Sequence, residues 1–221
     1  MASSRIVVLA SGSGTNLQAV VDGCSLGRID AQVVGVVSNR IDAYALVRAE
    51  RAGIPTELVE ARDDEERREH DARLAGAVAS FDPDWVVLAG WMRLLTTAFL
   101  DRFEGRVVNI HPALPGELPG TRAIERAWGE ALAGERRGSG VMVHLVPDEG
   151  VDDGPVLAAR TVPIDPSGTL DDFADAVHRT EHQLLVEALA ELCSPGAPGA
   201  APRAAAPEPA PEPRTTNEVR R

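Results

Sequence analysis

The sequence predicts a single-domain α/β protein. Its Rossmann-like, mostly parallel twisted sheet is expected to carry helices on both faces and antiparallel strands near the C-terminal end. Three observations lead to this fold class. The length of 221 residues suits one domain. Short β-branched and aliphatic runs alternate with stretches of helical periodicity, which is the order of βαβ units. Two further apolar runs, joined by an acidic loop, indicate a final pair of strands.

The first strand, at residues 5–10, leads into a glycine loop and a helix. The sequence from 11 to 19 is Ser-Gly-Ser-Gly-Thr-Asn-Leu-Gln-Ala. Glycines let the backbone approach a ligand closely, and the free N–H groups of a helix start favour an anion. The loop lacks the third glycine of the dinucleotide fingerprint and the Gly-Lys pair of a P-loop, so it favours a monophosphate. The alternative is a plain turn in which Thr15 or Asn16 is the helix N-cap.

The middle of the chain is predicted to alternate strand and helix twice more. In order, we expect a strand at 31–38, a helix at 42–51, a strand at 56–59, a helix at 63–80 and a strand at 84–89. The charged run at the start of the helix at 63–80 is expected to face solvent. Segment 90–95 is too apolar for an ordinary loop, which indicates either the lining of a pocket or core packing at a helix start.

A strand at 106–110 continues into His111 and Pro112. Side chains alternate along a strand, so Asn109 and His111 are expected to point to the same side. An amide can donate to a developing oxyanion, and an imidazole exchanges a proton near neutral pH. Pro112 ends the strand, which leaves the pair at the sheet edge where ligands bind in open α/β folds. The alternative is a turn-forming asparagine beside a surface histidine.

The last third of the chain is predicted to contain a helix at 123–133, strands at 140–146 and 155–162, and a long helix from 169 to 192. The acidic loop at 147–154 is either a functional segment or a solvated hairpin turn. His178, Glu181 and His182 match the inverted zinc-protease motif H-x-x-E-H. Because no helical region remains downstream to supply a third ligand, we expect no metal.

Domain boundaries and composition narrow the possible partners. We expect a folded domain at 1–194 and a disordered Ala/Pro-rich tail at 195–221. The chain has a net charge of −12, and its acidity lies in the domain rather than in the tail. An acidic domain makes nucleic acid and anionic membranes poor partners and leaves small molecules. The two cysteines have no metal-binding or disulfide spacing. No membrane span or secretory signal is recognisable, so a cytoplasmic monomer or homodimer is expected.

Four motifs occur in a fixed order along the chain. They are the glycine loop at 11–19, the apolar segment at 87–95, Asn-Ile-His-Pro-Ala-Leu at 109–114, and Val-His-Leu-Val at 143–146 followed by Asp-Asp-Gly-Pro at 152–155. Together they resemble the phosphoribosylglycinamide formyltransferases, a folate-dependent family of purine synthesis, over residues 5–192. The loop at 113–120 departs from the usual family pattern of Leu-Leu-Pro, an aromatic residue and Pro-Gly.

The resemblance implies a reaction and the residues that serve it. The formyl group of 10-formyltetrahydrofolate, a co-substrate, would move to glycinamide ribonucleotide without a metal. Asn109 and protonated His111 would stabilise the oxyanion, and Asp152 would raise the pKa of His111 and relay protons. The remaining positions that match the family's binding residues are Gly14, Thr15, Asn16 and Glu181 for the ribonucleotide, and Arg67, Met92, Arg93, Leu94 and Leu95, with Asn109, for the folate.

Other functions are left open by the same sequence. Methionyl-tRNA formyltransferase and formyltetrahydrofolate hydrolase use similar machinery, although the first normally adds a C-terminal barrel and the second an N-terminal regulatory domain. A non-catalytic nucleotide-binding module is a further alternative, against which the complete set of Asn109, His111 and Asp152 argues. His144 alternates with Val143 and Leu145 in a strand, so it is either packed in the core or directed towards the site.

Overall fold

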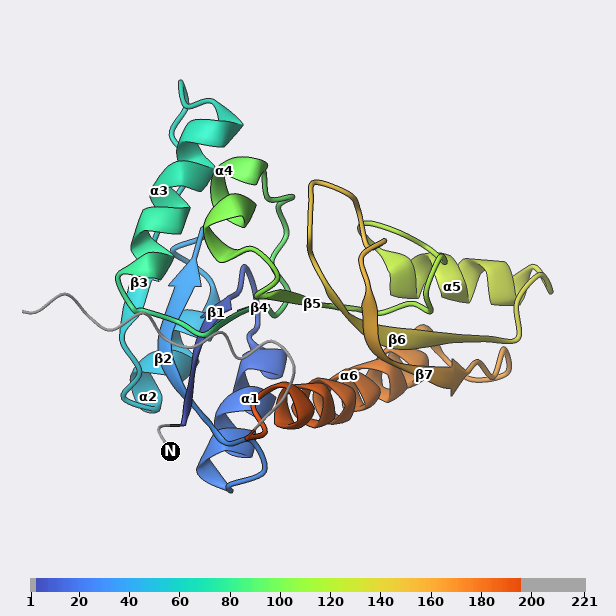
Figure 1. The fold of residues 1–221 in the computed structure, drawn as a ribbon. Coiled ribbons are helices and arrows are strands. Elements are labelled where there is room, and N and C mark those ends of the chain that lie inside the picture. Colours follow the sequence, from blue (N-terminus) through green and yellow to red (C-terminus); the bar gives the residue numbers. More distant parts are fainter. Residues whose placement is uncertain (1–2, 196–221) are drawn as a thin grey trace, which may run out of the picture.

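The computed structural model of the chain describes residues 3–195 (Figure 1). Within this range, seven strands form one sheet in the order β3-β2-β1-β4-β5-β6-β7. Their bounds are β1 (Ser4–Leu9), β2 (Ala31–Ser38), β3 (Thr56–Leu58), β4 (Trp85–Leu88), β5 (Val107–His111), β6 (Gly138–Leu145) and β7 (Val156–Pro163). Strands β1 to β5 are parallel, whereas β6 pairs antiparallel with β5 and β7. The predicted fold class is confirmed.

Helices cover both faces of this sheet. Their bounds are α1 (Thr15–Ser25), α2 (Tyr44–Arg51), α3 (Arg67–Ala79), α4 (Thr97–Leu100), the 3-10 helix η1 (Asp101–Phe103), α5 (Ala123–Leu132) and α6 (Leu170–Leu192). Figure 1 shows α3 and α4 on one side of the sheet and α1 and α6 on the other. A capping box fixes the start of α6, because Thr169 and Asp172 each accept the other's backbone N–H through their side chains.

The sheet divides the hydrophobic core into two clusters, because successive side chains of a strand point to opposite faces. One cluster packs against α1, α2, α5 and α6, and the other packs against α3 and α4. In β5, Val107 belongs to the α3 side and Val108 to the α1 side. Asn109 and His111 therefore share the α3 side with Val107, as the strand pattern predicts.

Two helix starts and one connection refine the sequence prediction. Helix α3 begins at Arg67 rather than at 63, because the Glu65 carboxylate accepts the backbone N–H of Arg62 and holds the charged run in a turn. Helix α2 begins at Tyr44 rather than at 42. The apolar segment after β4 runs into α4, so it does lead to a helix start. The predicted tail, apart from residue 195, lies outside the described residues.

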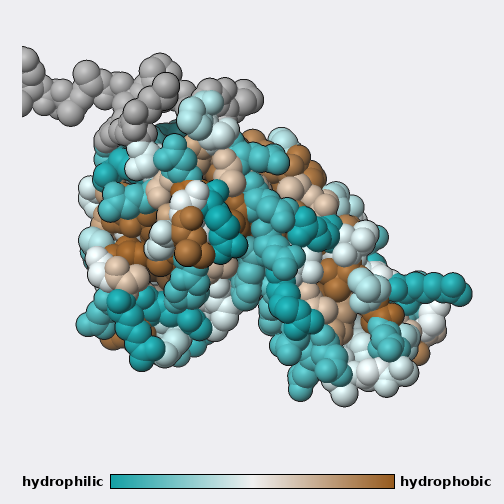
Figure 2. All heavy atoms as spheres, turned by 90° about the horizontal axis from the view of Figure 1, so that it is seen from below, coloured by the Kyte–Doolittle hydropathy of each residue, from teal (hydrophilic) through white to brown (hydrophobic). Residues whose placement is uncertain are grey.

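The strand order indicates where on the sheet a ligand-binding site is expected. Because the chain moves from β1 to β2 on one side and from β4 to β5 on the other, the loops that follow β1 and β4 diverge. Open α/β sheets bind ligands at such a switch point, outside the carboxyl ends of the strands. Much of the face seen in Figure 2 is hydrophilic, and its apolar residues form separate patches.

Candidate active site

A cavity of about 750 Å³ opens at the carboxyl ends of β1, β4 and β5. Its walls come from the glycine loop, the segment after β4, the end of β5, the acidic loop before β7, and α6. All but one of the predicted site residues line it: Gly14, Thr15, Asn16, Met92, Arg93, Leu94, Leu95, Asn109, His111, Asp152 and Glu181. Arg67 lies outside this lining. The fold thus gathers residues that are more than 160 positions apart in the sequence.

Asp152 reaches the end of β5 from the acidic loop. Its Oδ2 lies 3.3 Å from His111 Nδ1, and its Oδ1 accepts a hydrogen bond from Asn109 Nδ2 at 3.0 Å. The backbone N–H of Gly120 donates to Asp152 Oδ2 at 2.8 Å. Asp152 has a φ of 55°, in the left-handed region that aspartate adopts more readily than most residues. The structure therefore brings the three polar side chains together, and the acidic loop is more than a solvated turn.

Asp152 acts on the His111 pKa in the expected direction, but the net shift is the opposite one. Burial lowers the pKa of His111, and the attraction of the Asp152 carboxylate, which raises it, does not compensate. For Asp152, burial raises the pKa, but the contacts with His144, Gly120 and His111 together hold that pKa below its ordinary value. At neutral pH the pair is therefore a carboxylate beside a mostly neutral imidazole.

The other ring nitrogen of His111 faces the protein itself. His111 Nε2 lies 3.0 Å from the carbonyl oxygen of Leu118, in the loop that follows β5. Arg126 donates to the same oxygen at 2.7 Å. Leu118 has a φ of 46°, which is a strained conformation for a leucine. A substrate oxygen that uses His111 Nε2 must replace the Leu118 carbonyl.

His144 completes this group, and its orientation was left open by the sequence. It lies opposite Asn109 in the β5–β6 ladder, and side chains opposite each other in an antiparallel pair share a face. Asn109 Nδ2 donates to His144 Nε2 at 3.0 Å, while His144 Nδ1 donates to the Leu145 carbonyl at 2.8 Å. The amide hydrogens of Asn109 are thus shared between His144 and Asp152. Alternation with Val143 signals the correct face, but the register that sets His144 against Asn109 is a tertiary property.

The glycine loop delivers the start of α1 to the cavity. Gly14 is the N-cap residue, with a φ of 71° and no side-chain cap, so the alternative in which Thr15 or Asn16 caps the helix is wrong. A Cβ at Gly14 would lie 2.7 Å from Ala45 Cα, so glycine is required both by conformation and by the close approach of α2. The first turn of α1 therefore presents N–H groups without a side-chain cap, which is the arrangement that favours an anion.

Glu181 enters the cavity from the middle of α6 and is only 6 % exposed. Burial raises the pKa of Glu181 to about 7, and a hydrogen bond from the Asn16 amide opposes this rise. His178 lies on the same helix, with its Nε2 4.0 Å from Glu181 Oε2. The carboxyl group therefore changes charge close to physiological pH, which suits a group that receives a cationic or amine-bearing ligand.

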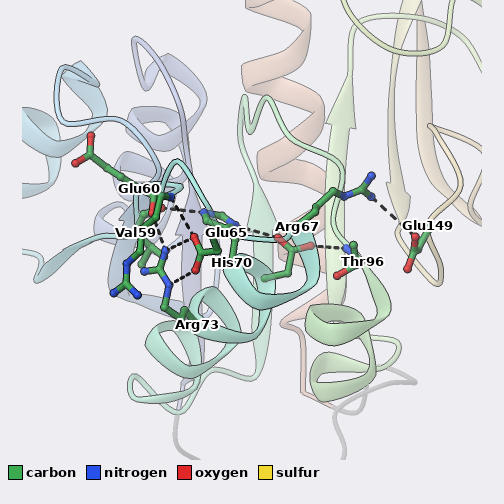
Figure 3. Close-up of polar contacts among 10 residues, drawn as sticks. Val59, Glu60, Glu65, Arg67, His70, Arg73, Thr96 and Glu149 are labelled. Atoms are coloured by element: carbon green, nitrogen blue, oxygen red, sulfur yellow. Dashed lines mark hydrogen bonds and ion pairs between the residues drawn. The ribbon is translucent and has the colours of Figure 1, made fainter.

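The segment from Met92 to Leu95 forms an apolar wall with one charged side chain. Met92 and Leu94 are exposed in the open cavity, whereas Leu95 is buried. Apolar side chains with a few polar groups are what a flat organic ring requires. Arg67 instead lies 4.0 Å from Glu149 of the acidic loop, so it takes part in the contact between that loop and α3 (Figure 3).

Two further findings concern residues 3–195. No three histidine, cysteine, aspartate or glutamate side chains in this range gather as a metal site would require. Among the same residues, no helix combines the length and apolar character needed to cross a membrane.

Comparison with known proteins places the chain in a family. The formyl transferase family model matches residues 4–189. A phosphoribosylglycinamide formyltransferase of Schizosaccharomyces pombe is 39% identical over 86% of this chain and 97% of its own. The Escherichia coli enzyme of that name is 40% identical over 81% of this chain and 82% of its own. A solved glycinamide ribonucleotide transformylase 1 from Symbiobacterium toebii superposes with a TM-score of 0.81 at 39% identity, covering 86% of this chain and 88% of its own. The chain belongs to the formyl transferase family.

Proposed function

We propose that the chain transfers the formyl group of 10-formyltetrahydrofolate to the amine of glycinamide ribonucleotide, as a step of purine biosynthesis in the cytoplasm. The products are formylglycinamide ribonucleotide and tetrahydrofolate. One observation carries the proposal: Asn109, His111 and Asp152 meet in a single cavity between an uncapped helix start and an apolar wall. The names of the relatives from S. pombe and E. coli support the choice of acceptor.

The cavity offers a separate place to each part of the two substrates. The ribonucleotide phosphate binds the N–H groups around Gly14, Thr15 and Asn16, where the helix dipole favours an anion. The glycinamide amine lies near the buried Glu181 carboxylate. The folate ring packs on the wall at 92–95, which brings its formyl group towards the end of β5.

The reaction is a direct attack of the amine nitrogen on the formyl carbon. A C–N bond forms, and the formyl oxygen becomes negatively charged in a tetrahedral intermediate. His111 Nε2, carrying a proton, donates to that oxygen. The Asn109 amide also donates to it, by releasing its contact with either His144 or Asp152. Because burial lowers the His111 pKa in the free protein, the developing oxyanion is what favours the imidazolium at this point.

Proton transfer completes the step. The Asp152 carboxylate accepts the proton that the attacking nitrogen loses, directly or through a water molecule. The same proton passes to N10 of the folate as the bond between N10 and the formyl carbon breaks. No side chain of the protein acts as a nucleophile. Most of the rate acceleration comes from holding the two bound substrates in the reactive orientation.

The purified full chain tests this proposal. With 10-formyltetrahydrofolate as donor, we expect folate absorbance to report transfer when glycinamide ribonucleotide is added, and mass spectrometry to find formylglycinamide ribonucleotide. Methionyl-tRNA and water serve as competing acceptors. Formylation of the tRNA, or release of formate at the same rate without acceptor, would replace the proposed activity with one of the alternatives.

A further inference from the structure

The apolar wall at 92–95 has no regular secondary structure, and side chains from elsewhere in the fold hold both of its ends. At the first end, the backbone N–H of Met92 donates to Ser11 Oγ at 3.0 Å. At the other end, the backbone N–H of Thr96 donates to Asp71 Oδ2 at 2.7 Å. The position of the wall therefore depends on two side-chain acceptors rather than on a helix or strand ladder.

Asp71 belongs to a buried polar pair on α3. Its side chain is completely buried, and that of the neighbouring His70 is 1 % exposed. His70 Nδ1 lies 3.1 Å from Asp71 Oδ1, and His70 Nε2 lies 3.1 Å from the carbonyl oxygen of Val59. Figure 3 shows His70 between Val59 and the side of α3 that faces Thr96. The chain of contacts therefore runs from the end of β3, through α3, to the wall of the cavity.

The contacts of His70 and Asp71 indicate that the pair orients a side chain rather than stabilises the fold. Both ring nitrogens of His70 face oxygen atoms, so the ring is held between the Asp71 carboxylate and the Val59 carbonyl. Removing these two polar side chains from water has a desolvation cost that their mutual contact barely offsets, so the pair is a weak source of stability. The pair instead fixes the orientation of the Asp71 carboxylate. Its Oδ1 is held by His70, which leaves Oδ2 to accept the Thr96 N–H.

We propose that Asp71, oriented by His70, is a positioning residue that sets the folate-side wall of the cavity at 92–95. The assignment of the wall to folate rests on the proposed function. Asp71 does not touch either substrate in this assignment, and it does not line the cavity. It acts through Thr96, the residue that directly follows the wall. Loss of Asp71 therefore affects the binding of folate more than that of the ribonucleotide.

Three variants separate this role from a general contribution to folding. Asp71→Leu keeps the side chain branched at Cγ but removes the acceptor of the Thr96 N–H. Asp71→Ala takes its place if the larger leucine prevents folding. Asp71→Asn is the conservative rescue, because its amide oxygen still accepts from the Thr96 N–H while its NH₂ group faces His70 Nδ1. Leu74→Ala is the matched control, since Leu74 is fully buried one turn further along the same helix.

Initial rates with each substrate varied in turn give the first measurement. We expect Asp71→Leu to raise the KM for 10-formyltetrahydrofolate about tenfold and to leave the KM for glycinamide ribonucleotide within about twofold. Asp71→Asn is expected to restore most of the folate KM. An unchanged folate KM in Asp71→Leu, equal rises for both substrates, or the same selective rise in Leu74→Ala would overturn the proposal.

Hydrogen–deuterium exchange gives a second measurement that does not depend on turnover. We expect the amides at 92–96 to exchange faster in Asp71→Leu than in the wild-type chain, in Asp71→Asn or in Leu74→Ala. Unchanged exchange in this segment contradicts the positioning role even if transfer is observed. If the wild-type chain transfers no formyl group, the proposed function fails, and the exchange comparison alone decides whether Asp71 positions the wall.

Discussion

Asp152 is the residue on which most of the site's contacts converge, because its two oxygens face Asn109, His111 and the Gly120 amide. Asp152→Asn removes its negative charge, and asparagine tolerates the left-handed backbone as well as aspartate does. We expect kcat to fall by about 10²-fold or more with little change in melting temperature. Asp153→Asn is the control, since Asp153 lies outside the cavity lining. A comparable loss in Asp153→Asn would transfer the proton-accepting role to that residue.

His111 gives a second prediction at the same scale. His111→Ala removes the donor to the oxyanion and leaves the surrounding apolar clusters intact, so we expect a folded protein that has lost most of its turnover. Circular dichroism and single-turnover kinetics measure the two properties separately. Turnover close to the wild-type rate in this variant would rule out the mechanism.

The titration of Glu181 makes the stability of the protein depend on pH. Because its pKa is about 7 in the folded state and lower when unfolded, the folded state holds more protons between these values, and stability falls as pH rises towards 7. We expect Glu181→Gln to increase the free energy of unfolding at pH 8 by about 2 kcal/mol and to have a much smaller effect at pH 5. Urea denaturation at both pH values measures this difference. An equal effect at the two pH values would contradict the titration of Glu181.

The residues that sequence reasoning missed share a physical cause. The alternation in β5 predicted the shared face of Asn109 and His111, because that rule is local. His144 and the Asp71–His70 pair depend on which strand or loop lies opposite, and a charged helix gives no local sign that two of its polar residues are buried. The net lowering of the His111 pKa was missed for a similar reason, since burial is a property of the whole fold.

At the scale of elements, the junction of β1 and α1 is the most constrained. Any side chain at Gly14 would adopt an unfavourable φ and meet the backbone of Ala45 on α2. We expect Gly14→Ala to shift α1 relative to α2, to destabilise the protein by about 1–3 kcal/mol, and to raise the KM for the ribonucleotide more than that for folate. Thermal denaturation and initial rates measure these effects. A selective rise in the folate KM would contradict the assignment of this loop.

The elements themselves were largely predictable, because strands and helices follow from hydrophobic periods of two and 3.6 residues. The start of α3 was not, since the charged run before it suits a helix and a turn equally until Glu65 finds the Arg62 amide. Arg67 illustrates the same limit. Its position on α3 was predicted, but its contact with Glu149 depends on how the acidic loop folds back over that helix.

At the scale of the whole molecule, both apolar clusters and the entire cavity lie within residues 3–195. We therefore propose that the boundary near residue 194 separates the catalytic domain from a segment that catalysis does not need. A chain that ends at residue 195 is expected to keep the kcat and both KM values of the full chain within about twofold, because it retains every residue to which we assign a contact with substrate. Steady-state kinetics of the two proteins make the comparison, and a large loss of activity would assign the last segment a part in the reaction.

The Leu118 carbonyl beside His111 bears on the strength of ligand binding. A neutral formyl oxygen that arrives at this nitrogen exchanges one uncharged acceptor for another, so the ground state gains little affinity from the swap. An oxygen that has acquired negative charge gains much more, because hydrogen bonds to ionised partners are about twice as strong. The resting contact thereby makes the imidazole selective for the intermediate over the substrate. Inhibitors with an anionic or tetrahedral centre should outcompete planar carbonyl analogues at this position.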